Sequence, residues 1–463
     1  MMLPSRYAFL SLALLLSGRV SGQSIAARDH HPAVATLGRS FVALDGPWKF
    51  RTGDDLRWAS PAFDDSSWEG VDLAPPAGAH DPDVGLTGYV PGWSAKGHPG
   101  YWGYAWYRMW VSIEARPGDT LALSGSPDVE SAYQVYLNGQ LLGSAGGFVG
   151  ATPMAYSIQP RIFLLPAVAT ASLENGRPAL LAIRVWMGPW AVGDPQAGGI
   201  HIAPLLGENA AIAAQYQIEW LQTIRGYVVE IVEAVLFVLL AVMSATLMAF
   251  ERSNRAYLWV SAALCLTALV RLNQAVYFWG QVETVHGFEL VTVVLLTPLC
   301  LGAWALAWNA WFKTPNAHRL ALAAGVLLAV YMSAEFVSRS WFYGMLPRWI
   351  GAAAHDEITW ARILFAVLIA FIAYRGIRFE GRDGWLALPA VGLISIGLFA
   401  PELSALHIPG IWFPFGTGVS RTQFAYAAFD AALFALLWHR LLTFAPRTRR
   451  LARAGPAGVT AGA

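Results

Sequence analysis

Seven long apolar stretches follow one another in the second half of the chain, and this feature constrains the fold more than any motif does. They cover residues 227–250, 257–279, 290–312, 320–337, 358–377, 385–403 and 424–442. A helix needs about 20 apolar residues to cross the hydrocarbon core of a bilayer. Hydrophobic residues make up 56% of the chain and charged residues only 13%, and the apolar excess follows Tyr227. We therefore expect an all-α, seven-helix transmembrane domain over residues 227–442.

The first residues are typical of a secretory signal peptide. Arg6 precedes an apolar run over residues 7–16, and small residues end at Gly22, so cleavage is expected before Gln23. An uncleaved anchor helix is the alternative, but the run is shorter than the about 20 residues that a span needs. We assign residues 1–22 to the signal peptide and residues 23–38 to a linker.

Short strand-like runs alternate with turns over residues 39–206. Aromatic and β-branched residues form the runs, and Gly, Pro and Asp separate them. This spacing predicts an exported all-β jelly-roll sandwich. Asn138-Gly139 predicts a tight hairpin, because its turn needs positive φ at both residues. The two cysteines, Cys265 and Cys300, both lie in apolar stretches, so the exported part is expected to fold without a disulfide.

Residues 207–226 connect the sandwich to the first apolar stretch. Their apolar side chains follow a helical period with one polar side. A juxtamembrane helix is expected here. Such a helix either couples the sandwich to the membrane domain or is an inert spacer.

Arginine and lysine are concentrated in alternate loops. With the sandwich exported, the cytoplasmic loops and tail contain Arg252, Arg255, Lys313, Arg319, Arg375, Arg378, Arg382, Arg440, Arg447, Arg449, Arg450 and Arg453, whereas the exported loops contain mainly Arg339, Arg348 and Arg421. This distribution satisfies the positive-inside rule and places the basic tail, residues 443–463, in the cytoplasm. The net charge of +1 indicates no basic groove, so nucleic acid is not an expected partner.

Four blocks of the exported segment resemble a known domain. They are LDGPWKF at residues 44–50, FDDSSW at 63–68, AWYR at 105–108 and YLNG at 136–139, followed by Gly143 and Gly146. In this order they resemble the galactose-binding-like jelly roll, the sugar-binding domain that opens glycoside hydrolase family 2 enzymes. The catalytic barrel of that family does not follow, because the chain continues into the apolar stretches.

Most polar and aromatic residues of these blocks are interpreted as structural. Large aromatic residues on strands are usually buried, and we expect this of Trp48, Trp68, Trp106 and Trp186. Asp64 and Asp65 are expected to cap a turn. Calcium binding is the alternative, but no ladder of oxygen ligands surrounds the pair.

The segment from Gly85 to Trp102 is the candidate ligand-binding rim of the sandwich. It combines aromatic and basic side chains with five glycines and two prolines. Exposed aromatic rings can stack on a sugar while polar neighbours bind its edge. The candidates are Tyr89, Trp93, Lys96, His98, Tyr101 and Trp102. The alternative is a long loop that packs on its own sandwich.

Seven spans behind an exported jelly roll resemble the bacterial seven-transmembrane receptors with diverse intracellular signalling modules. The resemblance lies in the order of the parts and covers nearly the whole chain. It implies an inner-membrane protein whose periplasmic sandwich binds a small or carbohydrate-like ligand and whose cytoplasmic side signals to a partner protein. A homodimer is also expected.

The last residues differ from that receptor pattern. A kinase, cyclase-type or phosphatase module usually follows the last span, but residues 443–463 contain neither a phosphate-binding loop nor an acidic metal cluster. The signal therefore leaves through a separate partner, or the output module has been lost.

Charged and polar residues inside the expected spans are the second group of candidates. They are Glu230, Glu233, Arg271, Gln274, Arg362 and Asp430, with Glu335 and Glu402 near the rim of the bilayer. The topology places them in the outer half of the bilayer, where a lone charge costs about 2.5–3.5 kcal/mol, so opposite charges should meet. The cluster is either an ion-pair network that joins helices or a pocket whose arginines bind an anion and whose acids bind a cation or hydroxyls.

The sequence contains no recognisable catalytic constellation. His286, His355 and His407 lie in expected loops without the spacing of a zinc-binding helix, and no Gly-x-Ser-x-Gly elbow is present. We expect no enzymatic activity, no metal and no cofactor. The sequence favours a membrane sensory receptor over a glycoside-hydrolase-like, carbohydrate-binding membrane protein. A transporter ranks lower still, because no inverted repeat is visible.

Overall fold

A computed structural model of the chain describes residues 41–80, 86–112, 120–149, 153, 160–167, 178–188, 195–251, 254–277, 285–342, 345–406, 408, 410–411 and 419–453. The predicted signal peptide and linker, Gly85, His407 and residues 454–463 of the tail lie outside these residues.

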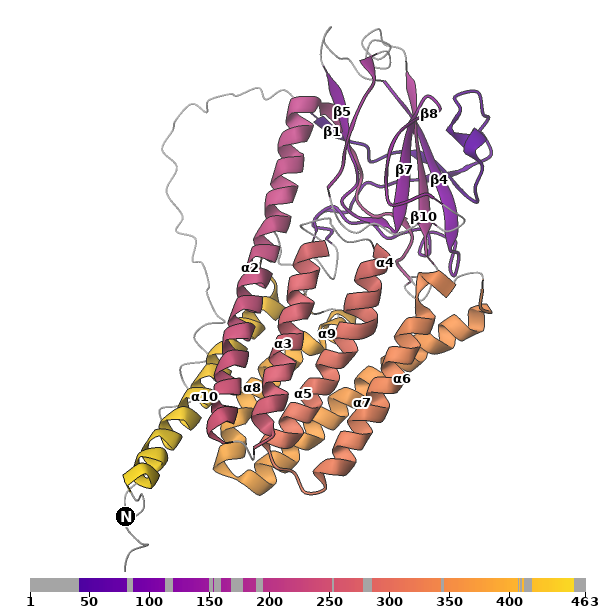
Figure 1. Cartoon of the computed structure of the whole chain (residues 1–463). Coiled ribbons are helices and arrows are strands. Elements are labelled where there is room, and N and C mark those ends of the chain that lie inside the picture. Colours follow the sequence, from indigo (N-terminus) through magenta and orange to yellow (C-terminus); the bar gives the residue numbers. More distant parts are fainter. Residues whose placement is uncertain are drawn as a thin grey trace, which may run out of the picture. The chain divides into compact units, whose positions relative to one another are not determined.

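Antiparallel sheets form the N-terminal domain (Figure 1). The larger sheet has the order β3 (Glu69–Val71), β2 (Trp48–Thr52), β4 (Gly103–Val111), β10 (Ala179–Met187), β7 (Ala132–Leu137) and β8 (Gln140–Ala145). The smaller sheet has the order β1 (Phe41–Ala43), β12 (Leu205–Glu208), β5 (Leu121–Ser124) and β9 (Ile162–Leu164), and a short pair joins β11 (Gly199–Ile200) to β6 (Val129–Glu130). The predicted all-β sandwich is confirmed.

The strands of the larger sheet bury both of their faces. On β4, Tyr107 belongs to the core between the sheets, whereas its neighbour Trp106 belongs to a second cluster on the outer face. The short 3-10 helix η1 (Leu56–Ala59) contributes Trp58 and Ala59 to that outer cluster. Trp48, Trp68, Trp106 and Trp186 are all 5% exposed or less, which confirms their interpretation as packing residues.

The turn between β7 and β8 forms as the sequence predicts. Asn138 has φ 50° and Gly139 has φ 88°, so both residues of the turn are left-handed. Asparagine and glycine tolerate this conformation best, which explains why this dipeptide closes the hairpin. The side chain of Asn138 also accepts the backbone N–H of Leu180 at 2.8 Å and so ties the turn to β10.

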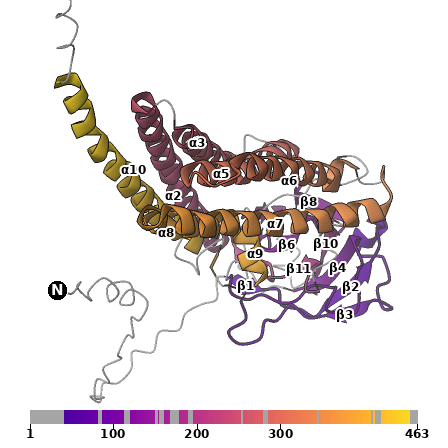
Figure 2. The same ribbon diagram turned by 90° about the horizontal axis from the view of Figure 1, so that it is seen from below.

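Helices make up the second half of the chain. The main ones are α2 (Asn209–Phe250), α3 (Ala256–Ala275), α5 (Thr297–Trp311), α6 (Ala317–Ser338), α7 (Arg348–Glu380), α8 (Arg382–Leu398) and α10 (Arg421–Arg453), and α5 is preceded by α4 (Val285–Phe288) and the π-helical segment η4 (Glu289–Leu296). Each main helix packs against the next, and α10 packs against α2, so the helices form a closed ring. Figure 2 shows α3, α5 and α6 in one row and α7 and α8 in another.

The chain is a multi-pass membrane protein by the length and hydropathy of its helices. Six segments within the described residues are long and apolar enough to cross a bilayer, namely Tyr227–Phe250, Ala256–Ala275, Glu289–Trp311, Ala317–Ser338, Trp349–Glu380 and Arg421–Leu442. Their outward side chains include Leu239 and Val242, each 59% exposed, as expected for surfaces that contact lipid.

The predicted sixth span is corrected at its C-terminal end. Residues 385–403 do not form one helix, because α8 ends at Leu398 and the short helix α9 (Ala400–Ala405) begins after Phe399. Pro401 lacks an N–H group and sits in the first turn of α9, where proline is tolerated, so the hydrogen-bond ladder of α8 cannot continue through it. The apolar part of α8, Gly384–Leu398, is shorter than the six long segments.

Candidate functional site

The rim loop, residues 86–102, lies against its own sandwich. Trp93 is 1% exposed and belongs to the core between the sheets, where its ring centroid lies 6.1 Å from that of Phe50. The indole N–H of Trp93 donates to the carbonyl of Tyr101 at 3.3 Å. Gly198 allows this close packing, since a Cβ at that position would lie 2.4 Å from the indole ring. Trp93 is therefore a core residue in this structure.

The basic side chains of the rim loop contact neighbouring strands and turns. Nζ of Lys96 donates to the carbonyl of Asp72 at 3.0 Å, and burial lowers the pKa of this lysine. Nε2 of His98 lies 3.1 Å from Oε2 of Glu69. Lys96, His98, Tyr101 and Trp102 are all half-buried. A binding role for these residues stays a prediction.

Tyr89 of the rim loop stacks on a buried histidine. The rings of Tyr89 and His201 are parallel, with centroids 4.9 Å apart. Nδ1 of His201 lies 3.0 Å from the carbonyl of Val90, and Nε2 lies 3.7 Å from Oε2 of Glu130. Burial lowers the pKa of His201, but the contact with Glu130 and the nearby charge of Asp128 outweigh burial and raise the pKa above its ordinary value.

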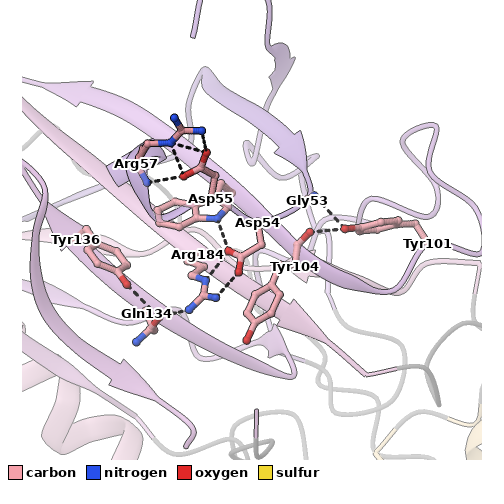
Figure 3. A network of polar contacts seen from close by, with 10 residues as sticks. Gly53, Asp54, Asp55, Arg57, Tyr101, Tyr104, Gln134, Tyr136 and Arg184 are labelled. Atoms are coloured by element: carbon pink, nitrogen blue, oxygen red, sulfur yellow. Dashed lines mark hydrogen bonds and ion pairs between the residues drawn. The ribbon is translucent and has the colours of Figure 1, made fainter. Parts of the chain in front are cut away.

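A polar network on the outer face of the larger sheet adjoins the rim loop (Figure 3). Nε of Arg184 donates to Oδ1 of Asp54 at 2.7 Å, and Nη1 donates to Oε1 of Gln134 at 2.7 Å. The guanidinium also lies over the ring of Tyr104, 4.0 Å from its centroid. We call this set the Arg184 network; it comprises Asp54, Tyr104, Trp106, Gln134, Tyr136 and Arg184.

Tyr101 connects the rim loop to the Arg184 network. Its hydroxyl donates to the carbonyl of Tyr104 and accepts the backbone N–H of Gly53, the residue before Asp54. A half-buried guanidinium, a carboxylate and an aromatic ring therefore lie together at the surface beside the rim. Such groups can stack on a ring and hydrogen-bond hydroxyl or carboxylate groups at its edge.

Arg271 is the centre of one intramembrane group. Its Nη2 lies 2.9 Å from Oε1 of Glu230 and 3.1 Å from Oε2 of Glu233, both on α2. Its Nη1 donates to Oε1 of Gln274 at 3.0 Å, and the guanidinium lies 5.0 Å from the ring centroid of Tyr426 on α10. This Arg271 group links α2, α3 and α10.

Asp430 on α10 belongs to the same region but makes no hydrogen bond. Its side chain is 7% exposed, and both carboxylate oxygens are buried without a partner among the residues that the structure describes. The charged group that acts on Asp430 is the carboxylate of Glu233. Asp430 therefore faces a like charge.

Arg362 is the centre of a separate group. It pairs with the carboxylate of Glu402, Nη1 donates to the hydroxyl of Tyr331 at 2.8 Å, and Nη2 donates to the carbonyl of Leu398 at 2.9 Å. Tyr331 lies on α6, Leu398 ends α8, and Glu402 lies on α9. The six candidates of the membrane domain thus do not form one cluster, because Arg362 finds its carboxylate on α9 and Arg271 finds its carboxylates on α2.

Histidine, cysteine and acidic side chains do not gather into a metal-binding group of three or more within the described parts of the chain. Asp64 and Asp65 take structural positions in the structure. Oδ1 of Asp64 accepts the N–H of Ser66 at 2.9 Å, and Oδ2 of Asp65 lies 2.9 Å from Nη1 of the buried Arg108. The predicted turn cap is confirmed for Asp64.

No family model and no curated protein matches the chain. Solved structures that match include a β-glucuronidase from Bacteroides uniformis, with 19% identity and a TM-score of 0.24 over 36% of this chain and 17% of that one. A glycoside hydrolase family 2 β-glucuronidase matches with 19% identity and a TM-score of 0.27 over 38% of this chain and 18% of its own. A family 2 member from Bacteroides cellulosilyticus has 19% identity and a TM-score of 0.23, and the match covers 36% of this chain and 20% of that one.

The N-terminal third of the chain therefore resembles part of these enzymes, and the chain spans between 17% and 20% of their length.

Several residues of these sites are absent from the sequence-based candidates. The clearest are Arg184, Asp54 and Gln134 in the sandwich and Tyr331 and Tyr426 in the membrane domain. The alternation of side chains along a strand could have found the first group. Tyr104 and Trp106 lie on one face of β4, and Gln134 and Tyr136 lie on one face of β7. Tyrosines inside spans give no comparable signal.

Proposed function

We propose that this chain is a membrane sensory receptor that binds a small, carbohydrate-like ligand through its sandwich and transmits the binding event through the helical ring to a cytoplasmic partner. The observation that carries the proposal is α2, a single helix of 42 residues that begins directly after β12 and ends at the far end of the first span. At 1.5 Å per residue its length is about 63 Å. The proposal includes no catalytic role for the chain itself.

The first turns of α2 are fixed to the sandwich. They pack against β5, β9 and β12, and Ile212 is completely buried there. Glu219 acts electrostatically on Tyr133 of β7, and burial raises the pKa of Glu219. Because no flexible linker separates the sandwich from the span, a small rotation or shift of the sandwich would move the whole helix.

The membrane part of α2 carries groups that would respond to such a movement. Glu230 and Glu233 hold Arg271 of α3 at distances of 2.9 and 3.1 Å. Rotation of α2 by a fraction of a turn would separate these pairs. A ligand that favours one position of the sandwich would then shift the population between two arrangements of the ring.

The distribution of basic residues supports an exported sandwich. Lys313 is exposed between α5 and α6, Arg319 is exposed in the first turn of α6, and Arg378 is exposed near the end of α7. These positions lie at the end of the bundle opposite to the start of the first span, so the positive-inside rule supports a sandwich outside the cytoplasm and an α10 that ends inside it. The proposed location is a bacterial inner membrane.

The proposed ligand surface is the junction of the rim loop with the Arg184 network. Full-length protein in detergent is titrated with a panel of neutral and acidic monosaccharides, and binding is followed by tryptophan fluorescence. Trp102→Ala should reduce the affinity for a monosaccharide that binds at least tenfold. Trp110→Ala is the matched control, since Trp110 is 50% exposed and lies outside the rim. Equal losses in both variants, or no binding by any sugar, would contradict the carbohydrate assignment.

Coupling through α2 is tested with the same sugar. Spin labels at Phe250→Cys and His439→Cys, in a background without Cys265 and Cys300, report the distance between the ends of α2 and α10. The sugar should change this distance in the parent and in Leu221→Ala. Leu221→Pro should abolish the change, because proline breaks the helix at a cost of about 3 kcal/mol. The same distance change in the proline variant would contradict the proposal.

A further inference from the structure

The Arg271 group contains more acid than base. Glu230, Glu233 and Asp430 are 9%, 2% and 7% exposed, and Arg271 is the cation that lies among them. With every group ionised, three carboxylates and one guanidinium would leave an excess of two negative charges inside the membrane. Such an excess is strongly unfavourable in a medium of low dielectric constant, so at least one carboxylate needs a proton or another cation.

Asp430 is the carboxyl group that the protein leaves uncompensated. Arg271 donates to one oxygen of each glutamate, whereas neither oxygen of Asp430 has a hydrogen-bond partner among the described residues. The remaining unpartnered oxygens of the glutamates are Oε2 of Glu230 and Oε1 of Glu233. Four carboxylate oxygens are therefore buried without donors at the contact of α2 with α10.

Among the residues that the structure describes, no second cation is found near Asp430. Glu233 of α2 acts electrostatically on Asp430. The titratable groups around the neighbouring Tyr426 of α10 are Glu230 and Glu233 on α2, Arg271 on α3 and Cys300 on α5. Residues 384–398 of α8, which also packs against α10, contain no titratable side chain. Aromatic rings close the site, since Phe237 of α2 lies 5.5 Å from Tyr426 and 6.2 Å from Phe429 between ring centroids.

We infer that Asp430 binds one exchangeable proton beside Glu233, at the contact of α10 with α2. A second negative charge near Glu233 in an apolar site is strongly unfavourable, and a proton on Asp430 removes that charge. A metal ion fits less well, because the described acidic residues form no group of three that could hold one.

The proton would control the contact between α2 and α10. With the proton bound, Asp430 is neutral and does not repel Glu233. Without it, two negative charges face each other and push the helices apart. The contact of α10 with the helix that joins the sandwich to the membrane thus depends on whether Asp430 is protonated. This inference goes beyond the proposed receptor function and does not depend on it.

Infrared spectroscopy of the full-length chain in lipid nanodiscs tests the inference. A protonated carboxyl group should give a carbonyl band at neutral pH, and labelling with ¹³C-aspartate should shift that band. The band should move in D₂O, as expected for an exchangeable proton. The absence of any protonated aspartate at neutral pH in the unlabelled and labelled wild-type protein would overturn the inference without any variant.

Variants assign the band. Asp430→Asn should remove it and leave the melting temperature unchanged, because asparagine resembles the protonated acid. Asp356→Asn is the matched control, since Asp356 is exposed on α7, and it should keep the band. A band that survives in Asp430→Asn would show that the proton is bound elsewhere. A loss of folding in that variant alone would show that the protein needs the negative charge of Asp430. Either result would overturn the inference. A band that disappears when sodium replaces choline would assign a metal ion instead.

Discussion

Nε and Nη2 of Arg271 both lie 3.1 Å from Oε2 of Glu233, so one carboxylate oxygen on α2 receives two donors from a single side chain on α3. The two residues are 38 positions apart in the chain. The contact ties the helix that leaves the sandwich to the next helix of the ring.

Arg271→Met should strongly destabilise the membrane domain. The substitution keeps an apolar stem but leaves the carboxylates of Glu230 and Glu233 without their cation. Breaking a buried pair by removing one partner costs about 3–5 kcal/mol. The melting temperature of the purified full-length protein should fall clearly, whereas Arg378→Met, at an exposed position of α7, should leave it unchanged. Equal melting temperatures of the two variants would argue against the ion-pair network.

Tyr331→Phe should have a smaller effect in the second intramembrane group. The hydroxyl of Tyr331 accepts a hydrogen bond from Nη1 of Arg362 at 2.8 Å, while Glu402 and the carbonyl of Leu398 still bind the guanidinium in the variant. The loss of one hydrogen bond to a charged group costs about 1.5–3 kcal/mol. The melting temperature should therefore fall less in Tyr331→Phe than in Arg362→Met, and the reverse order would contradict the assigned contacts.

Arg108→Lys should loosen the segment that covers the outer face of the larger sheet. Arg108 is 1% exposed and donates to the carbonyls of Ser60 and Phe63 at 2.9 and 3.2 Å while it pairs with Asp65. A lysine ammonium lacks the several planar N–H donors of a guanidinium and cannot make all three contacts at once. Each buried polar group that is left without a partner costs about 1–3 kcal/mol of folding free energy. Hydrogen exchange over residues 55–68 of the full chain should accelerate.

Arg57→Lys is the matched control for that experiment, because the side chain of Arg57 is 85% exposed. Its exchange over the same segment should equal that of the parent. If Arg108→Lys also leaves the segment protected, the guanidinium is not what holds it on the sheet.

His201 should make the sandwich less stable as the pH rises. Contacts with Glu130 and Asp128 raise the pKa of His201 despite its burial. Because the pKa of His201 is higher in the folded state, its protonation stabilises the fold. This stabilisation is complete at pH values below the ordinary histidine pKa of about 6.5, and it is lost as the pH rises through the higher pKa of the folded state. After correction for intrinsic rates, hydrogen exchange over residues 195–208 should therefore increase with pH.

His201→Gln should remove this pH dependence, and His80→Gln, at an exposed position, should preserve it. Exchange that falls with rising pH in the parent would reverse the sign of the expected linkage.

The order and type of the elements follow from the sequence. Period-two alternation predicts strands around Trp106 and Ile183, Asn138-Gly139 predicts the hairpin, and unbroken apolar runs predict the long helices. These signals are local and strong. The end of α8 does not follow from hydropathy, because the apolar run continues past Pro401 into α9.

The partners of the buried charges could not be derived in the same way. Depth in the bilayer placed Arg271 and Arg362 together, but partner choice depends on which helices adjoin in the ring and how each is rotated. Similarly, the glycines at 198 and 199 show where a backbone can approach closely, but not that Trp93 and Tyr107 fill the space beside them. Contacts between segments that are distant in the sequence require the folded structure.

The most direct test of the receptor account is the side of the membrane on which the sandwich lies. In a background without Cys265 and Cys300, single cysteines are placed at the exposed positions Ser66 of the sandwich and His318 at the start of α6. A membrane-impermeant maleimide is then applied to spheroplasts. The account predicts that Ser66→Cys reacts in intact spheroplasts and that His318→Cys reacts only after permeabilisation. Labelling of His318→Cys with protection of Ser66→Cys in intact spheroplasts would contradict it.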